Sequence, residues 1–214
     1  MTAPLPTLTG RWIALAPLAP DHGPALFTAL DHPSRGELAR FMVDPPPEDA
    51  GAFAVWIAAK ARADNRRYYA CVEPRSGEAQ GFLCLMRDEP AHRTIEIGDV
   101  LFTPALQRTR GATEAVHLLA AHVFEGMGYR RLEWKCDTRN APSHRAARRF
   151  GFTDEGVFRQ HMLVRGESRD SAWLSMLDSE WPARRRAFEA WLAPENFDAE
   201  GRQRASLEAL RAGA

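Results

Sequence analysis

The sequence predicts a single-domain α/β fold in which helices flank one mixed central β-sheet. Three observations carry this prediction. Short β-branched or alternating apolar segments indicate strands, segments with apolar residues three and four positions apart indicate helices, and the two kinds of segment are interleaved. The predicted order is one strand, two helices, three strands, one helix, one strand, one helix and two strands. The 214 residues, 45% of them hydrophobic, are enough for one sizeable core.

The N-terminal part of the chain predicts one strand and two helices. Residues 9–18 alternate well enough for a strand, and residues 20–30 predict a helix for which Asp21 is a suitable cap. A proline-rich loop leads to a second helix over residues 50–63. The apolar side of that helix is formed by Phe53, Ile57 and Ala61. We expect the two helices to form a flap over a pocket.

Three strands follow, and the third is the central one. Residues 67–73 and 80–87 have the composition of strands and are joined by a hairpin at residues 74–78. Residues 95–102 are almost continuously apolar, as in a strand that is covered on both faces. Pro104 ends this strand because proline has no N–H to donate to a neighbouring strand.

The central helix is predicted over residues 112–127, where apolar residues recur at spacings of three and four. Gly128 is well placed to end it in a left-handed conformation. Three polar residues are expected to lie off the apolar face: Glu114, His117 and His122. Neither histidine has metal-ligating neighbours at a suitable spacing, so no metal site is predicted.

The remainder of the chain predicts a strand over residues 131–137, a short helix over 140–149, and two long strands over 152–164 and 170–176. A hairpin at 165–167 joins the last two strands.

We therefore expect one domain over residues 8–180. A basic, amphipathic C-terminal helical extension over residues 181–214 follows it.

Composition excludes several classes of protein. The formal net charge is zero, so neither a nucleic acid nor an anionic membrane surface is an expected partner. No segment is apolar for long enough to span a bilayer, and the N-terminus has no signal-peptide pattern. Cys71, Cys84 and Cys136 stand far apart, which argues against a zinc site and a disulfide framework. A reduced, cytoplasmic setting fits best.

The turn from Gln107 to Ala112 connects the central strand to the central helix. Such a turn directs unpaired N–H groups and the positive end of the helix dipole at one spot, which suits phosphate. Arg108 and Arg110 add charge that a diphosphate can use, and Gly111 lets an anion approach the backbone. The alternative is an ordinary helix start with two solvated arginines, and the turn alone leaves both open.

A resemblance to a known family rests on two motifs. The first runs from Gln107 to Ala112 and continues as Thr113-Glu114-Ala115; the second is Asn140-x-x-Ser143 followed by Gly151-Phe152. With these motifs in the predicted elements, the sequence resembles the GNAT superfamily of acetyl-CoA-dependent N-acetyltransferases, in the branch of the RimJ and RimL ribosomal-protein N-terminal acetyltransferases. It departs from the family pattern at Arg110, where the middle glycine of the loop normally stands.

The resemblance implies a GNAT-like fold, acetyl-CoA as cosubstrate and no metal. It implies acetyl transfer to a primary amine by direct attack, the amine being a protein N-terminus, an amino acid or a related small amine. It also implies self-association, and the long final hairpin favours a homodimer. The residues expected to bind the cofactor are Leu101, Phe102, Gln107, Arg108, Thr109, Arg110, Gly111, Ala112, Thr113 and Asn140. A backbone N–H group near Val100 to Phe102 is expected to meet the oxyanion.

The reaction needs a base for the amine and a proton for the departing thiolate. Glu96 occupies the position at which several relatives carry a carboxylate base, and Asp99 is the second candidate, expected on the opposite face of the strand. Either residue could instead be a salt-bridged strand carboxylate. Ser143 is the expected proton donor, because Ala147 stands where many relatives have a tyrosine; alternatively, Ser143 only helps to start its helix. Asp99 and His161 are candidates for binding the acceptor.

Two other functions remain open. The chain could bind CoA without catalysis, in view of Arg110 in the loop and the missing tyrosine. A nucleotide-binding protein that uses the same turn is more remote, because the sequence contains neither a P-loop nor a dinucleotide-binding fingerprint.

Overall fold

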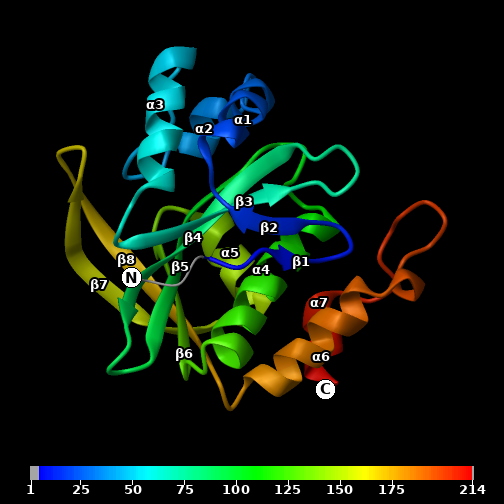
Figure 1. The fold of residues 1–214 in the computed structure, drawn as a ribbon. Coiled ribbons are helices and arrows are strands. Elements are labelled where there is room, and N and C mark those ends of the chain that lie inside the picture. The colour runs from blue at the N-terminus through cyan, green and yellow to red at the C-terminus, as the bar shows by residue number, and fades with distance from the viewer. Residues whose placement is uncertain (1–4, 214) are drawn as a thin grey trace. The chain divides into compact units, whose positions relative to one another are not determined.

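A computed structural model describes residues 5–213 of the chain. The chain divides into two compact units. The first contains the residues up to 88 and residues 96–119, and the second contains residues 89–95 and the residues from 120 onward. Each unit contains both strands and helices (Figure 1).

The first unit is built on strands in the order β1-β2-β3-β4-β5. Antiparallel pairing joins β1 to β2, β2 to β3, and β3 to β4. The central predicted strand is β5, and it begins one residue before the predicted start. The bounds are β1, Leu8–Thr9; β2, Ala14–Pro17; β3, Arg66–Val72; β4, Ala79–Glu89; and β5, Thr94–Phe102.

Three helices of the first unit are grouped beside its strands (Figure 1). They are α1, Gly23–Ala29; α2, Arg35–Ala39; and α3, Ala50–Ala61. The Asp49 side chain caps α3 by accepting a hydrogen bond from the Ala52 N–H at 2.8 Å. Phe53 and Ile57 of α3 pack in one buried cluster with Tyr68 of β3 and Phe82 of β4. This cluster fixes α3 against the sheet.

Two predictions for the N-terminal part were wrong. Residues 9–18 form no single strand, because β1 ends at Thr9 and the chain turns before β2. Helix α2 was not predicted, because its five residues are too few to show a helical period.

The central helix α4 spans Arg110–Ala121 and begins two residues before the predicted start. It continues as a π-helical turn, His122–Gly126, so the prediction of a regular helix to Met127 was wrong. Gly128 then adopts a left-handed conformation with φ +68°, as predicted. Glu114 is buried, contrary to its predicted place off the apolar face.

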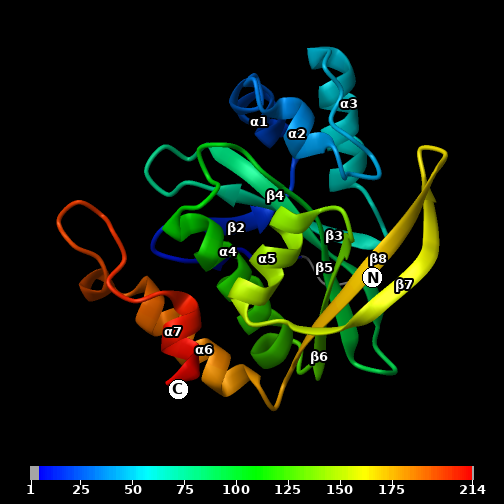
Figure 2. The same ribbon diagram turned by 180° about the vertical axis from the view of Figure 1, so that it is seen from behind.

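The second unit contains an antiparallel sheet in the order β6-β8-β7. Its strands are β6, Arg131–Asp137; β7, Thr153–Val164; and β8, Glu167–Leu177. The predicted hairpin between the last two strands is confirmed, with left-handed residues at Arg165 and Gly166 (Figure 2). β8 starts three residues before the predicted 170.

Three helices complete the second unit: α5, Ala141–Phe150; α6, Trp181–Leu192; and α7, Leu207–Ala212. Helices α6 and α7 lie side by side (Figure 2). Gly151 ends α5 with φ +99°, as the sequence predicts. The core of this unit is rich in aromatic side chains, including Trp134, Phe150, Phe152, Trp181, Phe188 and Trp191.

Cys71, Cys84 and Cys136 are free and buried thiols. None of the helices between residues 5 and 213 is long and apolar enough to cross a membrane. Within the same residues, no three His, Cys, Asp or Glu side chains are grouped so that they could hold a metal ion.

Candidate functional site

The turn between β5 and α4 is held by local hydrogen bonds. The N–H groups of Leu106 and Gln107 both donate to the Thr103 carbonyl at 3.0 Å, and the Gln107 side-chain amide donates to the Phe102 carbonyl at 3.1 Å. Arg108 adopts a left-handed conformation with φ +60°. These bonds fix the direction in which β5 passes into α4.

Thr109 caps the start of α4. Its hydroxyl accepts a hydrogen bond from the Ala112 N–H at 3.2 Å and donates to the Leu106 carbonyl at 2.6 Å. Arg110 and Gly111 therefore lie in the first helical turn rather than in the predicted loop. The N–H groups of that turn have no acceptor within the helix, so this end can receive an anion.

The Arg110 side chain lies over the Trp12 ring, with its guanidinium carbon 4.6 Å from the ring centroid. The same ring contacts Arg11 at 5.1 Å. A Cβ at Gly111 would lie 3.2 Å from the Leu106 side chain and 3.4 Å from the Trp12 carbonyl oxygen. The turn that carries Trp12 thus packs directly against the first turn of α4.

Glu114 holds that turn in place. Its carboxylate accepts hydrogen bonds from the backbone N–H groups of Arg11, Trp12 and Ile13 at 2.9, 2.6 and 2.9 Å. A side chain at Gly10 would collide with the same carboxylate, because a Cβ there would lie 2.5 Å from Glu114 Oε2. This contact was not predicted, because a glutamate in a helix does not indicate which distant backbone groups it binds.

Glu96 lies on β5 with only 3% of the residue exposed. The guanidinium of Arg87 on β4 lies 3.5 Å from Glu96 Oε2. Glu96 is thus a buried carboxylate that pairs with a half-exposed arginine.

Asp99 breaks the regular alternation of β5, with φ +47°. A Cβ at Gly98 would meet the Met86 thioether and lie 3.5 Å from Glu96 Oε1, and Met86 packs on the buried cluster that contains Tyr68. Asp99 also reaches this side of the sheet, because it accepts a hydrogen bond from the Tyr68 hydroxyl at 2.5 Å. The prediction that the two carboxylates lie on opposite faces was therefore wrong.

A buried lysine completes the surroundings of Asp99. Lys60 of α3 is 6% exposed, and its ammonium lies 2.7 Å from Asp99 Oδ2 and 3.2 Å from Asp44 Oδ2. The rings of Trp56, Tyr68 and Phe82 surround the ammonium at 4.4, 5.2 and 5.7 Å. Burial raises the pKa of Tyr68, and the charge of Asp99 raises it further. The hydroxyl of Tyr68 therefore keeps its proton and donates a hydrogen bond to Asp99.

A pocket of about 460 Å³ is lined by two arginines that pair with these carboxylates. Arg66 and Arg87 line it; Arg87 pairs with Glu96, and the Arg66 guanidinium lies 3.6 Å from Asp99 Oδ2. The rest of its wall consists of Asp64, Asn65, Arg67, Leu85, Met86 and Asp88.

In the second unit, Asn140 and Ser143 lie together at the start of α5. Asn140 Oδ1 accepts a hydrogen bond from the Ser143 N–H at 3.1 Å, which makes Asn140 the cap of α5. The Ser143 hydroxyl oxygen accepts a hydrogen bond from the Trp134 indole N–H at 3.1 Å. That bond orients the Ser143 hydroxyl so that its own proton can be donated elsewhere.

His161 lies on β7, where its Nδ1 is 2.9 Å from the Ser171 hydroxyl. Its ring contacts the rings of Phe158 and Trp173 with centroids 5.6 and 5.7 Å apart. The remaining predicted cofactor residues include Leu101, in the buried cluster of the first unit, and Thr113, whose hydroxyl is 3.5 Å from the Thr109 carbonyl.

One missed residue did carry a sequence signal. Lys60 stands three positions after Ile57 and seven after Phe53, so it is in phase with the apolar face of its helix. A lysine at such a position is buried unless it turns away, and a buried lysine needs a carboxylate partner.

Comparisons with known proteins show which sequences and folds the chain is similar to. The family model of the acetyltransferase (GNAT) domain matches residues 13–153. A GCN5-related N-acetyltransferase from Brucella melitensis is 43% identical, with a TM-score of 0.94 over 97% of this chain and 94% of that chain. A probable acetyltransferase (GNAT family) from Chromobacterium violaceum is 44% identical, with a TM-score of 0.77 over 85% of this chain and 91% of that chain.

A more distant structure shows the fold alone. A suspected ribosomal-protein-serine acetyltransferase from Vibrio cholerae is 18% identical, with a TM-score of 0.67 over 80% of this chain and 97% of that chain. No curated protein matches the sequence. The predicted fold class, an α/β fold with a mixed central sheet flanked by helices, is confirmed by the family match and the Brucella structure.

Proposed function

We propose, on the premise that the chain belongs to the GNAT family of acetyltransferases, that it acetylates a primary amine by direct attack on acetyl-CoA. The observation that carries the proposal is the placement of a buried carboxylate, Glu96, on the strand that leads into the Thr109-capped start of α4. The 43% identity to a GCN5-related N-acetyltransferase supports transfer to nitrogen.

The start of α4 suits the diphosphate of the cosubstrate. The first helical turn supplies backbone N–H groups and the positive end of the helix dipole. Arg108 and Arg110 flank this turn. We assign diphosphate binding to residues Gln107 to Thr113, and oxyanion stabilisation to the backbone near Leu101 and Phe102.

Glu96 is the proposed base. It accepts the proton of the acceptor ammonium through water, so that the neutral amine attacks the acetyl carbonyl. Asp99 fits this role less well, because its carboxylate already accepts hydrogen bonds from Lys60 and Tyr68. We propose that Asp99 holds α3 and β5 together through its ion pair with Lys60.

Ser143 is the proposed donor of the proton that the departing thiolate takes up. The hydrogen bond from Trp134 to the Ser143 oxygen supports this role, because it orients the hydroxyl, which also has a side-chain hydrogen bond with Cys136. The amide N–H₂ of Asn140 is assigned to the pantetheine arm, since its Oδ1 already caps α5. His161 is kept as a residue that contacts the acceptor.

Three finer points belong to the same proposal. Asn140-x-x-Ser143 favours the RimJ/RimL-like branch, the long β7–β8 hairpin favours a homodimer, and the buried free thiols favour a reduced, cytoplasmic setting. Light scattering of the purified chain tests the dimer.

The experiment that tests the function measures thiol release from acetyl-CoA with a thiol reagent. The acceptors are peptides with different first residues, free amino acids and small amines. Turnover with one class establishes the reaction and identifies the acceptor. Tight CoA binding without turnover for any acceptor overturns the catalytic proposal and favours a CoA-binding module.

A further inference from the structure

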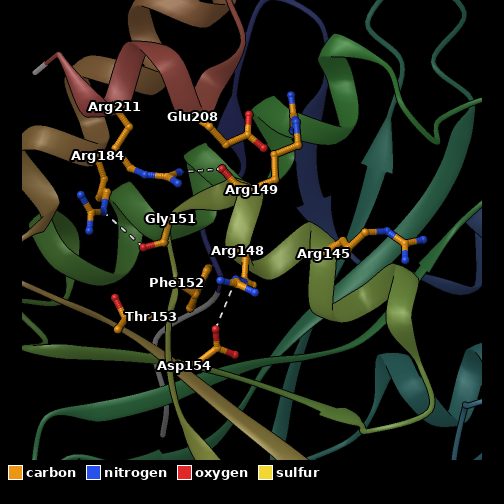
Figure 3. Close-up of a pocket in the computed structure, with 10 residues that line it drawn as sticks. All are labelled: Arg145, Arg148, Arg149, Gly151, Phe152, Thr153, Asp154, Arg184, Glu208 and Arg211. Atoms are coloured by element: carbon orange, nitrogen blue, oxygen red, sulfur yellow. Dashed lines mark hydrogen bonds and ion pairs between the residues drawn. The ribbon is translucent and has the colours of Figure 1, made fainter.

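A second pocket, of about 590 Å³, lies at the C-terminal end of α5 (Figure 3). Residues of α5, α6 and α7 line it, together with the first residues of β7. Asn140 caps the other end of α5, roughly 15 Å away for a helix of ten residues. The pocket therefore lies at the opposite end of α5 from Asn140 and Ser143, the residues at the start of that helix with proposed roles in acetyl transfer.

The pocket carries a strong positive charge. Five guanidinium groups and two carboxylates line it, which leaves a formal excess of three positive charges. One carboxylate, Asp154, is engaged by Arg148 and by His144. The other is Glu208 of α7. The arginines are Arg145, Arg148, Arg149, Arg184 and Arg211.

Arg184 and Arg211 converge on the end of α5 from the C-terminal helices (Figure 3). Arg184 Nε donates to the Gly151 carbonyl at 3.2 Å, and Arg211 Nη1 donates to the Arg149 carbonyl at 2.8 Å. Arg184 Nη2 also lies 3.7 Å from Glu180 Oε1. A guanidinium has five N–H donors in a planar fork, so donors remain for a ligand beside these contacts. Arg145, in contrast, points away from these two side chains in Figure 3.

Gly151 makes this convergence possible. It is left-handed, with φ +99°, and a Cβ at this position would lie 2.8 Å from Arg184 Cδ and 3.4 Å from Arg211 Cδ. Only glycine allows both arginine stems to approach the backbone here. Burial lowers the pKa of Arg211, and the nearby charge of Arg184 lowers it further. The nearby charge of Glu208 acts in the opposite direction and raises the pKa of Arg211.

We infer that this pocket binds a small multivalent anion of the phosphate class through Arg148, Arg184 and Arg211. An anion between the forks balances the excess positive charge of the lining, and planar guanidinium groups match phosphate oxygens in pairs. The family model ends at residue 153, so Arg184 and Arg211 lie outside the matched acetyltransferase segment. The C-terminal helices thereby add a binding site to the transferase fold.

Titration calorimetry with inorganic pyrophosphate tests the inference on the full chain. Excess desulfo-CoA is present throughout, so that cosubstrate phosphates occupy their own site. The wild-type protein is expected to bind one pyrophosphate. Arg184→Gln, Arg211→Gln and Arg148→Gln are each expected to weaken binding by about tenfold or more. Arg186→Gln, which removes an exposed arginine of the same helix α6, is the matched control and leaves binding unchanged.

A structural role for the arginines gives a different result. Arg184 and Arg211 also cap α5, so their variants lower the unfolding temperature without ligand in either case. Arg148 donates no such cap, and Arg148→Gln keeps the test valid if the other two variants fold poorly. The inference is overturned if the wild-type protein shows no saturable pyrophosphate binding in the presence of desulfo-CoA, or if Arg148→Gln binds pyrophosphate as tightly as wild type.

Discussion

The ammonium of Lys60 lies 2.7 Å from Asp99 Oδ2, and both side chains are less than 10% exposed. This ion pair joins α3 to β5 inside a wall of aromatic rings. A buried pair of this kind contributes little net stability relative to apolar residues of the same volume, but it makes each partner depend on the other. It therefore fixes the position of α3 next to the carboxylates of β5.

Lys60→Met is expected to lower the free energy of unfolding by up to about 3–5 kcal/mol, because the buried Asp99 loses Lys60, which lies closer to it than Arg66 does. Adding Asp99→Asn should recover part of that loss, since Asn tolerates the left-handed conformation and carries no charge. Urea denaturation of both single variants and the double variant measures the coupling. Arg62→Met, an exposed position at the end of α3, is the control. Additive effects of the two substitutions would refute the pairing.

Glu114→Gln tests the anchor between α4 and the turn before β2. The amide has one acceptor oxygen where the carboxylate has two, so at least one of the three backbone N–H groups loses its partner. We expect a loss of about 1–3 kcal/mol in the free energy of unfolding. Hydrogen exchange at Arg11, Trp12 and Ile13 should accelerate in the variant. Unchanged exchange at these amides would contradict the anchoring role.

Arg110→Gln tests the assigned diphosphate site. If Arg110 contacts the cosubstrate equally in the ground state and the transition state, the KM for acetyl-CoA rises by about tenfold while kcat stays unchanged. The control is Arg75→Gln, which removes one positive charge from the exposed hairpin between β3 and β4, far from Arg110 in the sequence. An unchanged KM would mean that Arg110 only packs on Trp12.

Glu155 provides the pH test. Its hydrogen bonds with Arg131 hold the pKa of Glu155 below its ordinary value of 4.5. Because the folded state then binds the proton less tightly than the unfolded state, the stabilisation is present above pH 4.5 and is lost as the pH falls through the lower folded-state value. Glu155→Gln should cost up to about 1 kcal/mol at pH 7, since the pair is partly exposed. That cost should shrink towards pH 3 in urea denaturation.

Glu195→Gln is the control for the pH test, because it removes an exposed carboxylate from the same unit. A difference between wild type and Glu155→Gln that stays constant from pH 7 to pH 3 would contradict the assigned ion pair.

Periodicity was sufficient for most of the fold and insufficient for the site. β6 has the predicted bounds, and Gly151 ends α5 as predicted, because both depend on local patterns. The side of β5 on which Asp99 lies depends on one left-handed residue, which alternation does not predict. Glu114 meets its partners about a hundred positions away in the chain, and no local pattern encodes such a contact.

Thiol release by Glu96→Gln at several pH values tests whether Glu96 is the base that takes the proton of the acceptor ammonium. At pH 7 we expect kcat/KM to fall by roughly 10²–10⁴-fold relative to wild type. The deficit should shrink at higher pH, because the acceptor amine then loses its proton without a base. Glu89→Gln, at the exposed end of β4, should match wild type. Wild-type activity of Glu96→Gln at pH 7, or a deficit that is the same at every pH, would contradict the account.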